Sequence, residues 1–142
     1  MEFETFPGNY SSLDAIRNFY KSAAEKAGLD EKAVYEVQMA VDEAASNIID
    51  HAYGGENLGN IECSYRASKG ELEIIIRDFG KPFNPALVDY PDMQTDIKNR
   101  KIRGLGLHFM NSLMDSVKFS FNGHGGNILT MVKTHASKLN CI

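Results

Sequence analysis

The chain has 142 residues, of which 43% are hydrophobic and 24% are charged. This length and composition predict one globular domain, residues 1–142, with a sizeable core, and they argue against a disordered chain. The formal net charge of −4 argues against direct nucleic-acid binding, and no apolar run is long enough to cross a bilayer, so we expect no membrane partner.

The first residues and the cysteines indicate the compartment. The N-terminal stretch "MEFETFPGNY" is acidic and lacks the basic-then-apolar order of a signal peptide. The two cysteines, Cys63 and Cys141, lie far apart and form no CxxC pair. We therefore expect a cytoplasmic protein without a disulfide framework or a zinc site.

The chain begins with the pattern of a strand and then of a helix. Residues 2–6 alternate in the strand period and stop at Pro7, which is typical of a short edge strand. Apolar residues then recur at helical spacing up to Gly28, which can end the helix, and Ser11 or Ser12 can cap its start.

A second helix is predicted to begin after Asp30, which can cap it, and to stop at Gly54-Gly55. Its apolar positions recur with the helical period, so we expect them to face the core. This predicted buried stripe consists of Val34, Val37, Val41, Ala44, Ala45, Ile48 and Ala52.

The second half of the chain predicts four strands around an irregular segment. Residues 60–67 and 71–79 read as a hairpin turning at Lys69-Gly70. The run Ile74–Ile76 predicts that the second strand is central and covered on both faces. Residues 116–122 and 127–134 alternate like strands, with "GHGG" as their turn, and a helix begins near Gly104.

Residues 80–103 hold three of the four prolines and many charges. So long an irregular connection inside a compact domain is usually functional or mobile, so we interpret it as a lid. Helices and strands do not alternate regularly along the chain. We therefore predict an α/β two-layer sandwich, in the sense of an α+β fold, with a mixed, mostly antiparallel sheet and helices on one face.

Three polar residues follow one another along the second helix. Glu43 and Asn47 are four residues apart, so they lie on one face about 5–6 Å apart at Cβ, and His51 continues the row. An amide oxygen suits Mg²⁺, and a carboxylate can take a proton from an attacking hydroxyl. A solvated helix face is the alternative, and periodicity alone favours it, because polar faces are the rule on helices.

Two glycine motifs have both a functional and a plain interpretation. Asp78 ends a strand, where it can accept a hydrogen bond from an exocyclic amine such as that of adenine, and Gly80 leaves room for a flat ring. Alternatively, Asp-x-Gly simply forms a turn. Gly104 and Gly106 open a helix whose N-terminus can attract an anion, or they are ordinary helix-start glycines.

A basic cluster directly precedes those glycines, and other common site motifs are lacking. The cluster, which fits phosphate binding or a solvated charge run, consists of Lys98, Arg100, Lys101 and Arg103. The sequence contains no HxxxH or HExxH zinc motif, no G-x-S-x-G elbow and no GxxxxGK[ST] loop.

The order of these motifs is more specific than any one of them. E-x-x-x-N on a helix, D-x-G after a strand, a long lid and G-x-G before a helix resemble the Bergerat ATP-binding fold of the GHKL, or histidine-kinase-like, ATPase superfamily. The stretches "VDEAASNIIDHAYGG", "IIIRDFGKPFNP" and "RGLGLHFMNSLMDSV" are most similar to the bacterial anti-sigma-factor serine/threonine protein kinases. The resemblance covers essentially the whole chain.

The resemblance implies a role for each motif residue. It implies that Glu43 is the general base and that Asn47 is the Mg²⁺ ligand and contacts the nucleotide. It implies an adenine contact at Asp78. The other residues that it places at the nucleotide are His51, Gly80, Pro82, Arg103, Gly104, Leu105, Gly106 and Leu107. Pro82 stands where many members of the superfamily have a second glycine, and proline there is common in the anti-sigma branch.

The resemblance also implies an activity and partners. We expect a bacterial, ATP- and Mg²⁺-dependent protein serine/threonine kinase that phosphorylates a STAS-domain anti-sigma antagonist, binds a sigma factor and forms a homodimer. A nucleotide-binding partner switch without phosphotransfer is the main alternative. A histidine kinase catalytic domain and a partner-binding protein without nucleotide are the others.

Overall fold

The described strands form one five-stranded sheet. The computed structural model describes residues 1–82, 109–122 and 125–134. Its strands are β1 (Glu2–Pro7), β2 (Asn60–Ser68), β3 (Glu71–Asp78), β4 (Ser116–Asn122) and β5 (Gly126–Thr134). They lie in the order β1-β2-β3-β5-β4 with every pairing antiparallel, so this sheet is antiparallel and not mixed. The edge position predicted for residues 2–6 is confirmed.

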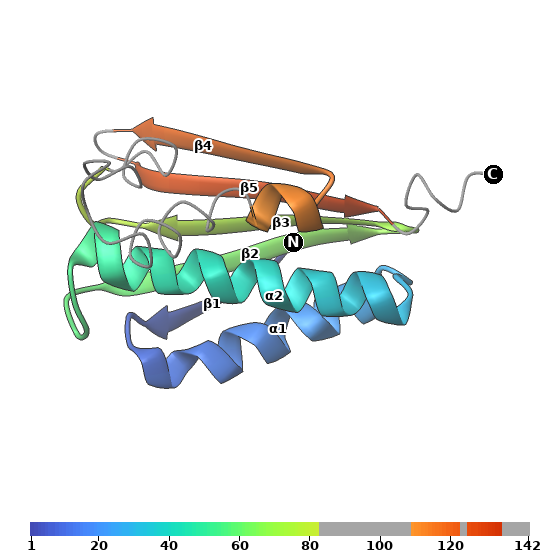
Figure 1. Cartoon of the computed structure of the whole chain (residues 1–142), viewed down its shortest axis with the longest axis horizontal. Helices are drawn as coiled ribbons and strands as arrows, with labels where there is room; N and C mark the ends of the chain where they lie inside the picture. Colours follow the sequence, from blue (N-terminus) through green and yellow to red (C-terminus); the bar gives the residue numbers. More distant parts are fainter. Residues whose placement is uncertain (83–108, 123–124, 135–142) are drawn as a thin grey trace, which may run out of the picture.

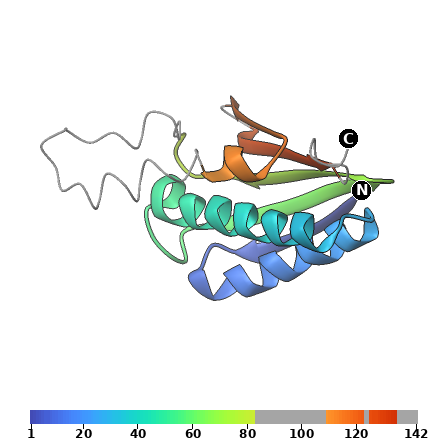
Figure 2. The ribbon, with the colours of Figure 1, turned by 45° about the vertical axis from the view of Figure 1, so that its right-hand side comes forward.

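Two long helices cover one face of this sheet (Figures 1 and 2). They are α1 (Leu13–Lys26), which follows a short 3-10 turn over Tyr10–Ser12, and α2 (Glu31–Asn47). The predicted two-layer α/β sandwich is confirmed. Among the described residues, none of the helices combines the length and the apolar character needed to span a membrane.

The predicted helix boundaries are mostly confirmed. The Asp30 side chain accepts a hydrogen bond from the Ala33 backbone N–H at 2.8 Å and caps α2. Gly28, with φ +80°, ends the first helix in the left-handed region that favours glycine. The predicted serine cap is wrong, because Ser12 stands at the N-cap of α1 but its side chain makes no capping hydrogen bond.

A π-helical turn, Ile48–Tyr53 (η2 in the order of elements), continues α2 to the left-handed Gly54. The apolar periodicity did not predict this change. Hydrogen bonds in a π-helix join residues five apart instead of four. Residues four apart lie on roughly the same side of either helical form, so the continuation of the Glu43 and Asn47 row to His51 stays a prediction.

The core lies between the helices and the sheet. All positions of the predicted α2 stripe are buried. An aromatic cluster of Phe6, Phe19, Tyr20 and Tyr65 packs edge to face where β1, α1 and β2 meet. The buried Tyr20 hydroxyl lies 3.0 Å from the carbonyl oxygens of Ser64 and Ile75, which fixes α1 on the middle of the sheet.

β3 is the central strand of the sheet, as predicted, but only one of its faces is buried. Leu72, Ile74 and Ile76 face the helices and are 0–1% exposed, whereas Ile75 between them is half-buried. The prediction that both faces are covered is therefore wrong for the described residues. The apolar run Ile74–Ile76 did not distinguish a strand covered twice from one covered once.

A buried lysine joins three elements. Lys133 of β5 is 6% exposed. Its Nζ forms an ion pair with Glu36 of α2 at 2.9 Å and donates a hydrogen bond to the Leu113 carbonyl. Leu113 ends the described helical segment 109–113, which belongs to the helix predicted to begin near Gly104. The lysine thus anchors this segment to both layers.

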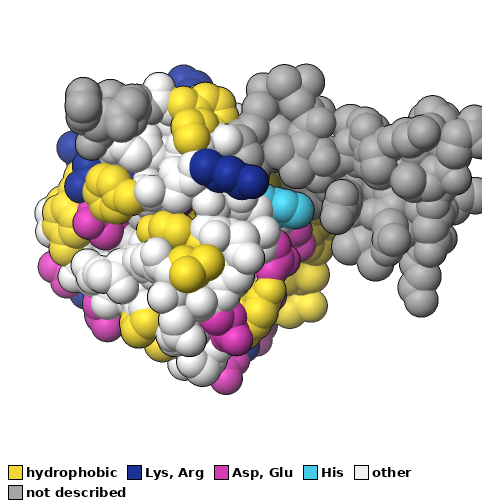
Figure 3. Space-filling view, turned by 90° about the vertical axis from the view of Figure 1, so that its left-hand side faces the viewer, with side chains coloured by type: hydrophobic (Ala, Val, Ile, Leu, Met, Phe, Trp, Pro, Cys, Tyr) yellow, Lys and Arg dark blue, Asp and Glu magenta, His cyan; other side chains and the backbone are white. Residues whose placement is uncertain are grey.

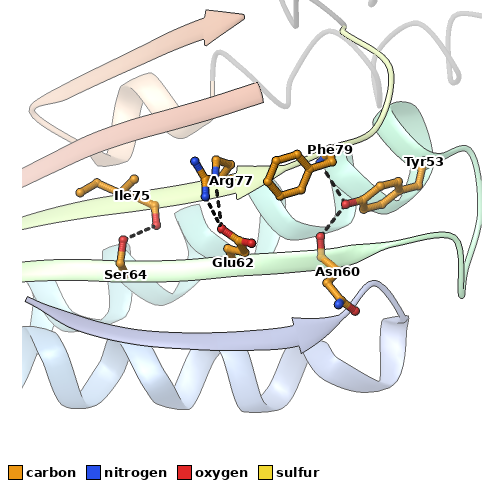
Figure 4. A network of polar contacts seen from close by, with 7 residues as sticks. All are labelled: Tyr53, Asn60, Glu62, Ser64, Ile75, Arg77 and Phe79. Atoms are coloured by element: carbon orange, nitrogen blue, oxygen red, sulfur yellow. Dashed lines mark hydrogen bonds and ion pairs between the residues drawn. The ribbon is translucent and has the colours of Figure 1, made fainter. Parts of the chain in front are cut away.

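Hydrogen bonds join the chain at the end of β3 to the π-helical turn that follows α2. The Lys81 backbone N–H donates to the Ala52 carbonyl at 2.9 Å. The Tyr53 hydroxyl accepts from the Phe79 N–H at 3.0 Å and donates to the Asn60 carbonyl, so it also joins β2 (Figure 4). These contacts set the position of the chain after Asp78.

Gly80 allows this close approach. A Cβ at residue 80 would lie 2.4 Å from the Ala52 carbonyl oxygen and 2.5 Å from its carbon. These are backbone atoms, so the overlap can be relieved only by moving one segment away from the other. The glycine is therefore required by packing, whatever else it does.

We expect Gly80→Ala to lower the free energy of unfolding by about 1–3 kcal/mol, the usual cost of overpacking. Urea denaturation measures this cost. Lys81→Ala, which changes an exposed side chain next to it, is the control and should stay within about 0.5 kcal/mol of the wild type. Equal stability of Gly80→Ala and the wild type would contradict the proposed contact.

Candidate functional site

One pocket brings together two of the predicted site residues. Asn47 of α2 and Asp78 of β3 both line it, between the helix layer and the sheet. Met110, Phe119 and Phe121 line it too, and Asn127 completes its polar side. The pocket's volume is about 10 Å³, which is the space of about one water molecule. A larger ligand therefore requires one wall to move.

Asp78 is buried at the end of β3, with 2% of its surface exposed. Its Oδ1 accepts hydrogen bonds from the Gly80 backbone N–H at 2.9 Å and from Asn127 Nδ2 at 2.8 Å. The first bond is an Asx turn, so the turn interpretation of Asp-x-Gly is confirmed. Both bonds end on Oδ1, which leaves Oδ2 as an acceptor for a ligand in the pocket.

Asn127 holds both the carboxylate and the backbone that follows it. Its Nδ2 lies 2.8 Å from Asp78 Oδ1, 3.3 Å from the Gly80 carbonyl and 3.2 Å from the Lys81 carbonyl. It is the cross-strand partner of Asp78 and is 5% exposed. Asn127 therefore positions Asp78 inside the pocket.

Burial raises the pKa of the Asp78 carboxyl above its usual value, because the charged form loses hydration. The hydrogen bonds from Asn127 and Gly80 act in the opposite direction, because they favour the carboxylate. The net result is a raised pKa, because burial has the larger effect. The Asp78 charge is thus held at a cost in stability that a donor from a ligand would offset.

An ion pair holds α2, the helix that carries Glu43 and Asn47, against α1. Glu43 and Asn47 are both half-buried on α2. Their neighbour Asp42 pairs with Arg17 of α1 at 2.5 Å, in a partly buried contact. The Ser46 hydroxyl bonds back to the carbonyls of Asp42 and Glu43 at 3.0 and 3.1 Å. The Arg17–Asp42 pair therefore joins α2 to α1 next to Glu43, whereas the Ser46 bonds stay within α2.

Some predicted site residues have a structural explanation or lie elsewhere. His51 is half-buried in the π-helical turn, Gly80 packs on Ala52, and Pro82 is exposed. The structure gives Gly80 a packing role, so room for a flat ring remains a prediction. Most of the predicted lid lies outside the described residues, with the basic cluster and with Arg103, Gly104, Leu105, Gly106 and Leu107.

Sequence reasoning placed only Asn47 and Asp78 of the pocket's lining residues at a site. Met110 follows the predicted helix start near Gly104, and Phe119 and Phe121 lie in the predicted strand 116–122. Helical or strand periodicity alone does not indicate that these side chains line a pocket. Asn127 was missed because its contact with Asp78 depends on the register between β3 and β5. The turn predicted for the sequence "GHGG" indicates the β4–β5 pairing, but not the β3–β5 register.

The end of the molecule where α2 and β3 stop is mixed in character. Figure 3 shows hydrophobic side chains scattered over it among charged ones. The structural elements at this end carry four of the chain's exposed large hydrophobic residues, which are Tyr10, Leu58, Phe79 and Phe121. Phe79 lies under Arg77, whose guanidinium is 5.0 Å from the ring centroid and which also pairs with Glu62 (Figure 4).

Comparisons with known proteins match this arrangement. A family model described as the histidine kinase-like ATPase domain matches residues 6–133. A serine-protein kinase RsbW of Listeria monocytogenes is 32% identical over 103 residues, which cover 70% of this chain and 66% of that relative. The RsbW of Halalkalibacterium halodurans is 29% identical over 133 residues, covering 91% and 80%. The predicted resemblance is confirmed.

Solved structures support the fold. The RsbU and RsbW domains of a Mycobacterium tuberculosis protein align with a TM-score of 0.63 at 14% identity, over 94% of this chain and 31% of that one. The catalytic domain of histidine kinase ThkA aligns with a TM-score of 0.53 at 16% identity, over 95% and 97%. The chain spans just under two thirds of the Listeria relative, 66% of its length.

The raised pKa of Asp78 predicts a pH-dependent stability difference. Below the ordinary aspartate pKa of about 4 the acid is neutral in both states, and above its raised folded pKa the buried charge destabilises the fold. The free energy of unfolding of the wild type, relative to Asp78→Asn, should therefore fall as pH rises from about 3 to about 7.

Denaturant titrations across that pH range measure this difference. Ser68→Ala, which changes an exposed side chain without a titratable group, is the control. Its stability difference from the wild type should stay constant across this pH range. A wild type that gains stability over Asp78→Asn with rising pH would mean that the folded state favours the charged carboxylate.

Proposed function

Because the chain belongs to the histidine kinase-like ATPase domain family, we propose that it is an ATP-dependent protein serine/threonine kinase. The observation that carries the proposal is the pocket lined by both Asn47 and Asp78. These residues come from a helix and a strand separated in the chain by another strand. Because both residues line one pocket, they support a single nucleotide site, with Asn47 near the phosphates and Asp78 near the base.

The adenine base is assigned to Asp78. Its Oδ2 accepts the hydrogen bond of the exocyclic amine, while Oδ1 stays bound to Gly80 and Asn127. The base replaces the hydration that burial removed from the carboxylate. The site would favour adenine over bases that carry no donor at that position, because such a base would leave the buried Asp78 Oδ2 unpaired.

The α2 helix is assigned to the phosphates. Its half-buried side chains offer an amide oxygen at Asn47 and a carboxylate at Glu43. These are oxygen donors of the kind that Mg²⁺ accepts alongside phosphate oxygens and water, so the residues fit this ion. Asn47 would hold the metal, which when bound neutralises charge on the triphosphate.

Phosphate transfer then needs only one proton acceptor from the chain. The hydroxyl oxygen of a partner's serine or threonine attacks the γ-phosphorus, and the bond to the β–γ bridging oxygen breaks to release ADP. Glu43 accepts the hydroxyl proton. The anchoring of its helix by the Arg17–Asp42 pair supports a fixed position for this carboxylate.

The proposed partners follow the relatives named serine-protein kinase RsbW. The substrate is a STAS-domain anti-sigma antagonist, and the chain also binds a sigma factor and forms a homodimer in the bacterial cytoplasm. A partner switch that binds nucleotide without phosphotransfer is the alternative. It predicts nucleotide binding by calorimetry and no change in the intact mass of the antagonist.

Glu43→Ala tests the proposed catalysis. We expect it to keep ATP affinity and to slow phosphate transfer from ATP to the cognate antagonist by about 10²- to 10⁴-fold, the usual contribution of a general base. The readout is the intact mass of the antagonist over time. Glu31→Ala, on the exposed first turn of the same helix, should transfer at the wild-type rate. Undiminished transfer by Glu43→Ala would remove it as the base.

Asp78→Asn tests the base site. The Asn oxygen can keep the bonds to Gly80 and Asn127, but its NH₂ group then faces the adenine amine, which is also a donor. We expect ATP affinity to fall by about tenfold or more. The variant should be at least as stable as the wild type at neutral pH, because the substitution removes a buried charge. Equal ATP affinity of both proteins in calorimetry would exclude Asp78 from this role.

A further inference from the structure

An exposed phenylalanine stands in the same row of the sheet as Asp78. Register pairs Asp78 of β3 with Asn127 of β5, and Asn127 with Phe121 of β4. Cross-strand partners point to the same face, about 4.5–5.5 Å apart at Cβ. Phe121 is 44% exposed, although it lines the pocket.

The neighbouring rows show that this exposure is particular to residue 121. Phe119 occupies the equivalent place one row further in, beside Leu129, and packs against the core. Among the residues that line the pocket, Phe121 alone is exposed, and the others are buried or half-buried. With a volume of about 10 Å³, the pocket must widen to admit a base. Phe121 is the wall that can move without breaking core contacts.

We propose that Phe121 stacks on the purine ring and forms the movable wall of the base site. This inference rests on the proposed nucleotide binding, and it adds a contact to the face of the base where Asp78 reads its edge. Stacking on an aromatic ring is open to any base, because every base has a π-face. Phe121 therefore contributes affinity, and Asp78 contributes discrimination.

A tryptophan at this position reports stacking directly. The chain contains no tryptophan, so Phe121→Trp introduces a single selective fluorophore. We expect ADP with Mg²⁺ to quench its emission, because the purine stacks on the indole. The matched control is Phe3→Trp, at a position 68% exposed on the opposite face of the sheet. Its emission should not change on addition of ADP.

Removal of the ring tests the affinity. Phe121→Ala should bind ADP about tenfold more weakly than the wild type in calorimetry, within the range found for base-stacking aromatics. Phe121→Tyr should restore the affinity. Inorganic tripolyphosphate with Mg²⁺ has no base, so it should compete with ADP for the wild type and for Phe121→Ala with the same affinity.

The outcomes separate this inference from the proposed function. A wild type that binds no ADP would defeat the proposed function itself. A wild type that binds ADP, together with an unquenched Phe121→Trp or an unweakened Phe121→Ala, would overturn only the stacking role. Equal weakening of ADP and tripolyphosphate by Phe121→Ala would also overturn it, because a general disturbance of the pocket would then explain the loss.

Discussion

The contact between the Ala52 carbonyl and the backbone of residues 80–81 determines the rest of the site. It joins the end of a helix to the end of a strand through the Lys81 N–H, and it leaves no room for a Cβ at Gly80. Asn47 precedes this contact on the helix, and Asp78 precedes it on the strand. The two groups face one pocket because the segments that carry them are joined at this point.

The Asp78 carboxylate both shapes the loop after β3 and places a buried charge in the pocket. One oxygen shapes the loop through Gly80 and Asn127, and burial makes the charge costly to maintain. An aspartate chosen for loop shape alone could be exposed at no cost, as turn aspartates usually are. Asp78 is instead only 2% exposed and lies beside Asn127 of β5. Buried carboxyl groups with a shifted pKa occur most often at functional sites.

Local patterns in the sequence predicted the elements well and the contacts between them less well. Alternation found the strands, and Asp30, Gly28 and Gly54 marked helix ends because capping and left-handed turns depend on neighbouring residues. The π-helical turn was not predictable, because the same apolar stripe satisfies both helical forms. Asn127 was missed because strand register is a tertiary property. The motif order indicated Asn47 and Asp78, but their shared pocket required coordinates.

The contacts of Lys133 affect which parts of the molecule can unfold locally. Its ammonium is held by Glu36, which precedes residues 83–108 in the chain, and by the Leu113 carbonyl, which follows them. If the 109–113 segment detached alone, the buried Lys133 ammonium would lose its hydrogen bond to the Leu113 carbonyl. Leaving a buried charged group without such a bond is destabilising. The segment, β5 and α2 therefore belong to a single cooperative unit in the sense of native-state hydrogen exchange.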